Sequence, residues 1–123
     1  MTIIVVDDNL VSRLLPSFIL RPYGMVVQVL ECETGADALR MIEMHHVTHV
    51  LLDISMPNMD GVKVATKIRS DLKHSSVRLI AYTADALAAD VPYLKSIGFN
   101  DVLFKPLRSS ELLEALGILS IGE

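Results

Sequence analysis

The chain has 123 residues and a mass of 13.5 kDa, and its 51% hydrophobic and 21% charged residues suit one globular domain and exclude disorder. The net charge of −4 disfavours nucleic acid and anionic membranes as partners, because both attract a basic face. The first residues lack the basic segment of a signal peptide, and no apolar run approaches the roughly 18 residues of a membrane span. The single cysteine, Cys32, cannot form an internal disulfide, which fits a reducing compartment. Taken together, these features lead us to expect a soluble cytoplasmic domain over residues 1–123.

Five short apolar segments alternate along the chain with segments of helical spacing. The predicted strands cover residues 3–6, 26–30, 47–52, 77–82 and 101–104. They are rich in β-branched residues and continuous rather than alternating, which is typical of strands buried on both faces. A strand–helix alternation repeated five times predicts a doubly wound α/β fold, with a parallel sheet covered by five helices on both faces.

Start signals mark several of the predicted helices. The first helix is expected over Leu10–Leu20 although Pro16 lies inside it and removes one backbone hydrogen bond. Thr34 is expected to cap the second helix, and Ser109 or Ser110 the last one.

A second proline, Pro92, lies in the segment between the fourth and fifth strands. We expect Asp90 to cap the helix there and Pro92 to occupy its first turn, where proline is tolerated. Residues 84–90 are then predicted to form a mobile loop or a separate turn.

Polar side chains follow the predicted carboxyl ends of four strands, where doubly wound sheets bind their ligands. These residues are Asp7-Asp8, Asp53, Thr83 and Lys105-Pro106. Three carboxylates at one edge would repel one another unless a cation lay between them, and oxygen ligands suit Mg²⁺. With one Mg²⁺ and the ammonium group of Lys105, the charges sum to zero.

This arrangement of charges meets the needs of phosphoryl transfer, which depends on positioning and on neutralising the phosphoryl oxygens. Asp53 is then the predicted nucleophile, forming an acyl phosphate. Thr83 can donate a hydrogen bond to a phosphoryl oxygen.

The chain resembles the receiver domain of two-component response regulators, chiefly the stand-alone receivers of chemotaxis. Four motifs carry the resemblance in order: Asp7-Asp8-Asn9, Asp53-Ile54-Ser55-Met56-Pro57-Asn58-Met59-Asp60-Gly61, Thr83-Ala84 and Lys105-Pro106. It extends from Ile3 to Leu116 and implies a flavodoxin-like strand order of 2-1-3-4-5. It also implies a single receiver domain over residues 1–123, with no output domain.

The resemblance assigns roles to the residues at this edge. Asp53 is implied as the phosphoacceptor, and the Mg²⁺ ligands are implied to be Asp8, Asp53 and the main-chain carbonyl of Ser55, with Asp7 acting through metal-bound water. Thr83 and Lys105 are implied to bind the phosphoryl oxygens. Pro106 is implied to follow a cis peptide bond.

The resemblance also implies partners. The phosphoryl donor is expected to be a sensor histidine kinase or a histidine phosphotransferase, and the domain catalyses only its own phosphorylation and dephosphorylation. Output is expected through docking of an unidentified protein on the face formed by the fourth helix, fifth strand and fifth helix, or through onward phosphorelay. Neither nucleic acid nor a membrane is expected as a partner.

Three positions depart from the family or tune its chemistry. Val102 stands where the family usually has an aromatic side chain that moves together with the threonine, so we expect a smaller switch carried by residues 83–89. Asp85 and Ser55 occupy positions that adjust the phosphate lifetime or partner choice in the family.

Three other functions share part of this pattern. An FMN carrier has the same architecture, but Asp7-Asp8 would repel the flavin phosphate. A haloacid-dehalogenase-type phosphatase needs a second aspartate two residues beyond the nucleophile, where this chain has Ser55. A receiver-like docking module that works without phosphorylation stays as the alternative, favoured by Val102.

Several further residues are predicted to have no part in the chemistry. The histidines are expected to be solvated or packed rather than to bind metal; they are His45, His46, His49 and His74. Arg13 is expected to project to solvent or to a partner, and Cys32 to be a packed side chain.

Overall fold

The computed structural model describes residues 1–56, 61–85 and 90–118. One sheet is built from β1 (Thr2–Val6), β2 (Gln28–Cys32), β3 (His49–Asp53), β4 (Arg78–Thr83) and β5 (Asp101–Phe104). Its strand order is β2-β1-β3-β4-β5, and every neighbouring pair is parallel. The doubly wound sheet in the predicted order is therefore confirmed.

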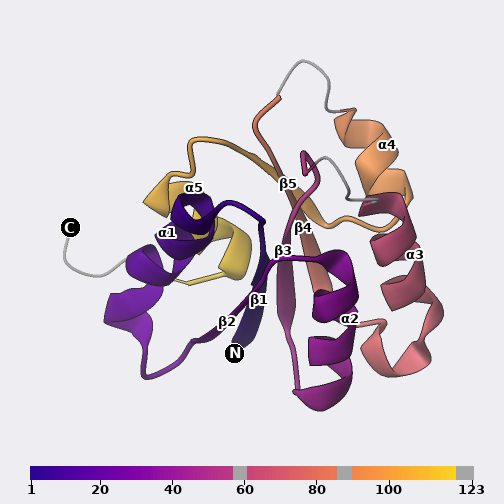
Figure 1. Ribbon diagram of the computed structural model, residues 1–123, viewed down its shortest axis with the longest axis horizontal. Coiled ribbons are helices and arrows are strands. Elements are labelled where there is room, and N and C mark those ends of the chain that lie inside the picture. Colours follow the sequence, from indigo (N-terminus) through magenta and orange to yellow (C-terminus); the bar gives the residue numbers. More distant parts are fainter. Residues whose placement is uncertain (57–60, 86–89, 119–123) are drawn as a thin grey trace.

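Helices cover both faces of this sheet. Within the described residues they are α1 (Leu10–Leu20), α2 (Gly35–Met44), α3 (Gly61–Ser70), α4 (Val91–Ser96) and α5 (Ser109–Leu116), with short 3₁₀ turns η1 (Arg21–Tyr23) and η2 (Leu72–His74). Figure 1 shows α1 and α5 on one side of the sheet and α2, α3 and α4 on the other. No helix in the described part of the chain is long and apolar enough to cross a membrane.

The two faces of the sheet bury separate apolar clusters, because successive side chains of a strand point to opposite faces. In β1, Ile4 and Val6 pack under α2 and α3, whereas Ile3 and Val5 pack under α1 and α5. β3 is buried along its whole length. This explains why the strands are continuously apolar, since both of their faces are covered.

The second strand begins two residues later than the predicted segment 26–30. The amide groups of Val26 and Val27 both donate to the carbonyl of Tyr23, so these residues belong to the turn after η1. The strand consequently ends at Cys32 rather than at Leu30.

Most of the predicted helix starts are confirmed. The side chain of Thr34 accepts a hydrogen bond from the amide of Asp37, and that of Asp90 accepts one from the amide of Tyr93. Asn9 caps α1 in the same way. α1 runs through the buried Pro16 as one helix.

The predicted cap of the last helix is wrong. α5 begins at Ser109, so both serines lie within its first turn, and Arg108 occupies the N-cap position without a side-chain hydrogen bond.

The mobility predicted for residues 84–90 concerns mainly residues 86–89, which lie outside the described residues. The motif residues 57–60 also lie outside them.

Candidate functional site

The polar residues that follow the strands meet at the carboxyl edge of the sheet. The hydrogen bonding between β1 and β2 continues one residue past β1, because the amide of Asp7 donates to the carbonyl of Cys32. On the other side of β3, the amide of Lys105 donates to the carbonyl of Thr83. Asp53 is the last residue of β3, the central strand, and lies between these neighbours.

One ammonium group joins two buried carboxylates at this edge. The Nζ atom of Lys105 lies 2.9 Å from Oδ2 of Asp53 and 3.3 Å from Oδ2 of Asp7. The residues Asp7 and Asp53 are 0% and 2% exposed, whereas the lysine side chain is 20% exposed. Charge pairing is what permits two carboxylates to be buried side by side.

Ser55 holds the other oxygen of Asp53. Its backbone amide and its hydroxyl both donate to Oδ1, at 2.9 and 2.6 Å. Burial alone would raise the pKa of Asp53, but the hydrogen bonds from Ser55 and Lys105 outweigh it, so the pKa of this carboxyl lies below its ordinary value. Asp53 is therefore an ionised carboxylate near neutral pH, as a nucleophile must be.

Asp7 is in a less favourable environment than Asp53. Burial raises the pKa of Asp7, and the charge of Asp53 adds to this effect, although hydrogen bonds from the Asn9 amide and from Lys105 oppose it. The pKa of Lys105 is raised, because its contacts with Asp53 and Asp7 outweigh the effect of its burial. The site thus has one cation for two buried anions.

A third carboxylate, that of Asp8, completes the cluster. Asp8 is exposed, and oxygens of Asp7, Asp8 and Asp53 lie within 4.8 Å of one another. Three negative charges against the single charge of Lys105 leave an excess of two, which one divalent cation would balance. An all-oxygen donor set of this kind fits Mg²⁺, with Asp7, Asp8 and Asp53 as the residues that would hold it.

Thr83 lies beside this cluster at the end of β4 and is 4% exposed. Its Oγ1 accepts a hydrogen bond from the amide of Asp85 at 3.1 Å, which fixes the start of the following loop.

The peptide bond between Lys105 and Pro106 is cis, as expected. Val102 is partly buried and packs against the core under α2, α3 and α4.

Arg13 contradicts the expectation that it projects to solvent or to a partner. Its side chain is 12% exposed and ion-paired with Glu31 at 3.3 Å, and its Nη1 donates to the main-chain carbonyl of Asp7 at 2.9 Å. Because α1 starts immediately after the acidic pair, an arginine one turn into it can reach back to β1 and β2. The sequence shows the positive charge of Arg13 but not its partners, because Glu31 lies on another element, β2.

Met56 is a second residue near the site whose contact the sequence did not reveal. It is 8% exposed, and its Sδ accepts a hydrogen bond from the amide of Asp8 at 3.1 Å. The thioether thus links the segment after β3 to the segment after β1, the two segments that carry the carboxylates.

Other predicted residues lie away from this cluster. Cys32 is buried, which raises the pKa of its thiol to about 11, so it is a packed and unreactive side chain. His49 is buried at the start of β3 and contacts Thr48 at 2.8 Å, while His45 and His46 are exposed. His74 lies between Glu43 and Asp71.

The sequence matches the response regulator receiver domain family over residues 3–117. Similar proteins include the sensor kinase/phosphatase CqsS of Vibrio cholerae, 31% identical over 90% of this chain, and the sensor protein EvgS of Escherichia coli, 36% identical over 87%. The chain spans 16% and 9% of their lengths. A 14.6 kDa protein of Leptolyngbya boryana is 34% identical over 92% of this chain and 85% of its own length.

Solved structures show the same fold. The receiver domain of the sensor histidine kinase PA1611 from Pseudomonas aeruginosa, solved with a magnesium ion in its active-site cleft, is 32% identical and covers 94% of this chain and 93% of its own, with a TM-score of 0.80. The chemotaxis response regulator CheY4 of Vibrio cholerae is 22% identical, covers 94% and 95%, and has a TM-score of 0.82.

The family match extends over nearly the whole chain, and the fold, the strand order and the acidic cluster agree with it. The chain therefore belongs to the response regulator receiver domains of two-component systems.

Proposed function

We propose that Asp53 accepts a phosphoryl group from a phosphohistidine in a Mg²⁺-dependent reaction. The observation that supports this most is the pairing of Asp53 with Lys105 at 2.9 Å inside a cluster of three carboxylates. The arrangement provides an ionised nucleophile, a fixed cation for the phosphoryl oxygens and oxygen donors for a metal. The magnesium in the PA1611 receiver domain supports the same choice of metal here.

The proposed reaction transfers the phosphoryl group between two residues. A carboxylate oxygen of Asp53 forms a bond to phosphorus while the phosphorus–nitrogen bond of the donor breaks, and the imidazole of the donor keeps that electron pair. Lys105 stays beside Asp53 and neutralises charge on the transferred oxygens, and the hydroxyl of Thr83 is available to donate to one of them. Bound Mg²⁺ would supply the remaining charge neutralisation, held by Asp8, Asp53 and the carbonyl of Ser55, with Asp7 acting through metal-bound water.

Dephosphorylation would reverse the modification without a second enzyme. A water molecule attacks the phosphorus, the bond to the Asp53 oxygen breaks, and inorganic phosphate leaves with the carboxylate restored. Asp85, whose amide is fixed by Thr83, is proposed to adjust the rate of this step or the choice of partner.

The donor is proposed to be a sensor histidine kinase or a histidine phosphotransferase. Several relatives of the chain are sensor kinases by name, which supports this class of donor. We further propose that the chain is cytoplasmic and works as a stand-alone regulator of one domain. The stand-alone arrangement is supported by the Leptolyngbya protein, which the chain matches over 85% of that protein's length. Its output would be a protein that docks on α4, β5 and α5, or onward phosphorelay.

The signal would be passed without an aromatic partner for Thr83. Val102 has no ring to move, so we propose a smaller switch carried by residues 83–89, of which 86–89 lie outside the described residues. NMR spectra of the beryllofluoride-bound protein are expected to change in this segment. Large changes at Val102 with none in the segment would contradict the proposal.

Phosphotransfer from a phosphorylated histidine phosphotransfer domain tests the proposed function. The wild-type chain should remove the label from the donor when Mg²⁺ is present, and Asp53→Asn should not. Glu114→Gln, which changes an exposed carboxylate on α5, serves as the matched control and should behave as wild type. Failure of the wild type with both phosphohistidine and small acyl phosphates would favour the alternative, a docking module that works without phosphorylation.

A further inference from the structure

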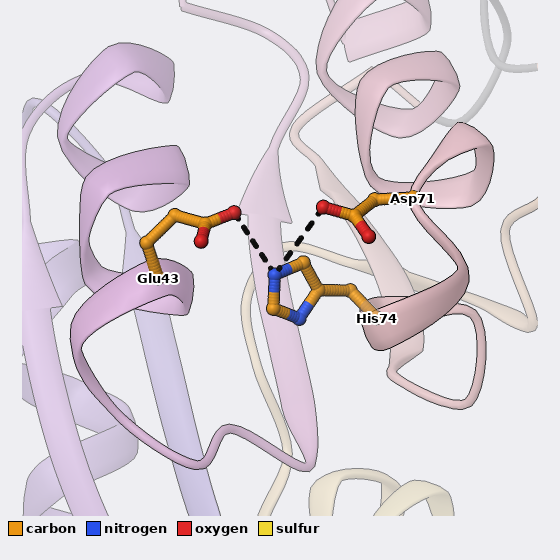
Figure 2. Close-up of side chains that lie close together, drawn as sticks. All are labelled: Glu43, Asp71 and His74. Atoms are coloured by element: carbon orange, nitrogen blue, oxygen red, sulfur yellow. Dashed lines mark hydrogen bonds and ion pairs between the residues drawn. The ribbon is translucent and has the colours of Figure 1, made fainter.

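A second group of metal-ligating side chains lies between α2 and η2. Figure 2 shows Glu43, from the last turn of α2, and Asp71 pointing toward the same ring nitrogen of His74. Nε2 of His74 lies 3.0 Å from Oε1 of Glu43 and 3.7 Å from Oδ2 of Asp71. α2 leads into β3 and η2 leads into β4, so this cluster lies at the sheet edge opposite Asp53.

The spacing of these three atoms suits a tetrahedral metal ion. Ligand bonds near 2.1 Å place the ligand atoms of such an ion about 3.4 Å apart. The two distances from Nε2, 3.0 and 3.7 Å, lie on either side of this value, and all three ligand atoms lie within 4.8 Å of one another. Small side-chain rotations would therefore be enough to seat the ion.

Two of the three ligands are held in place by the backbone of η2. Oδ1 of Asp71 accepts a hydrogen bond from the amide of Lys73 at 2.9 Å, which leaves Oδ2 as the atom that faces His74. The amide of His74 donates to the carbonyl of Asp71 at 3.0 Å, and the imidazole side chain is 17% exposed. Glu43 is 58% exposed and supplies the movable ligand.

The surroundings leave room for an ion and its water. The cluster borders a hollow of about 550 Å³ between α2 and α3. Arg40 and Lys67 also line this hollow, and Arg40 is already ion-paired with Asp37. The two carboxylates bring negative charge to the site, which a divalent cation would balance.

We propose that Glu43, Asp71 and His74 bind a divalent transition-metal ion of the zinc class, with water as the remaining ligand. The imidazole decides the class of metal, because nitrogen ligands favour zinc and its neighbours, whereas Mg²⁺ prefers oxygen. Such an ion would tie the end of α2 to η2. The site is independent of phosphoryl transfer, since it shares no residue with the cluster around Asp53.

Calorimetric titration of the full chain with ZnCl₂ in excess Mg²⁺ tests the proposal, since Mg²⁺ is expected to occupy the carboxylates around Asp53. We expect one Zn²⁺ per chain, with the affinity reduced by at least about tenfold in His74→Gln and in Glu43→Gln. His46→Gln is the matched control, because it removes an exposed histidine close in sequence to Glu43 and should leave binding unchanged.

NMR spectra recorded during the same titration locate the ion. Signals of residues 43, 71 and 74 should shift, and those of Asp7, Asp8 and Asp53 should not. The proposal is overturned if no saturable binding is seen, if His74→Gln binds Zn²⁺ as the wild type does, or if His46→Gln abolishes binding. The absence of zinc binding would mean that His74 contacts the two carboxylates without a metal ion.

Discussion

Single residues at the carboxyl edge of the sheet differ in how well their charges are compensated. Asp53 accepts hydrogen bonds from Ser55 and Lys105, which keep its pKa low despite burial. Asp7 shares the same lysine but is penalised by burial, which raises its pKa. Asp8 adds a third charge from the exposed side. The free protein therefore carries excess negative charge where a divalent cation is expected to bind.

Mg²⁺ is accordingly expected to stabilise the folded chain. At a concentration tenfold above its Kd, a ligand that binds only the native state adds about 1.4 kcal/mol to the free energy of unfolding. Asp8→Asn should lose most of this gain, because it removes one carboxylate from the cluster. Thermal unfolding with and without Mg²⁺ measures the effect, and Glu114→Gln should retain it. Equal stabilisation of Asp8→Asn and wild type would exclude Asp8 as a metal ligand.

At the scale of elements, one arginine joins the end of α3 to the segments that precede β4 and β5. Arg69 donates to the carbonyls of Ser75, Val77 and Gly98, and to the side chain of Asn100, at distances between 2.6 and 3.2 Å. Gly98 has a φ of 121°, and a Cβ atom there would lie 2.8 Å from Cγ of Arg69. The glycine thus allows both the backbone conformation and the close approach of the arginine.

Loss of this arginine should destabilise the fold without changing the acidic cluster. Arg69→Gln leaves the part-buried carbonyls of Val77 and Gly98 without this donor, which is expected to cost about 2–4 kcal/mol of unfolding free energy. Urea denaturation measures this, and Arg108→Gln, at a side chain 76% exposed, is the matched control. A cost below that of the control would show that the Arg69 contacts add nothing to stability.

The start of β3 makes the stability of the fold depend on pH. Burial, Arg78 and the N-terminal amino group lower the pKa of His49, so the folded chain resists protonation there. The unfolded chain takes up that proton near the ordinary histidine pKa of about 6.5. The free energy of unfolding therefore decreases as the pH falls below this pKa towards the lower pKa of the folded chain.

The substitution His49→Asn removes this titration while keeping a polar side chain near Thr48. The unfolding free energy of the wild type should fall more steeply between neutral and mildly acidic pH than that of the variant. The other histidines are common to both proteins and cancel in the difference. Urea denaturation of both proteins at a series of pH values measures the slopes, and parallel pH profiles would contradict the assignment.

For the whole molecule, the sequence predicted the architecture well because its strands are continuously apolar and its motif residues come directly after them. Asp7, Asp53, Thr83 and Lys105 could be placed at one edge since parallel strands share a carboxyl edge. The contacts of Arg13 and His74 could not be predicted in this way. They join residues on different elements, and neither periodicity nor spacing reports which side chains meet across a fold.

The acceptance of a phosphoryl group by Asp53 is the central claim for the whole molecule, and mass spectrometry after incubation with acetyl phosphate tests it most directly. The wild-type chain should gain one phosphoryl group only when Mg²⁺ is present, and peptide mapping should place it on Asp53. Asp53→Asn should gain none, whereas Glu114→Gln should gain it as the wild type does. A wild-type chain that stays unmodified, or an Asp53→Asn variant that is still modified, would contradict the account.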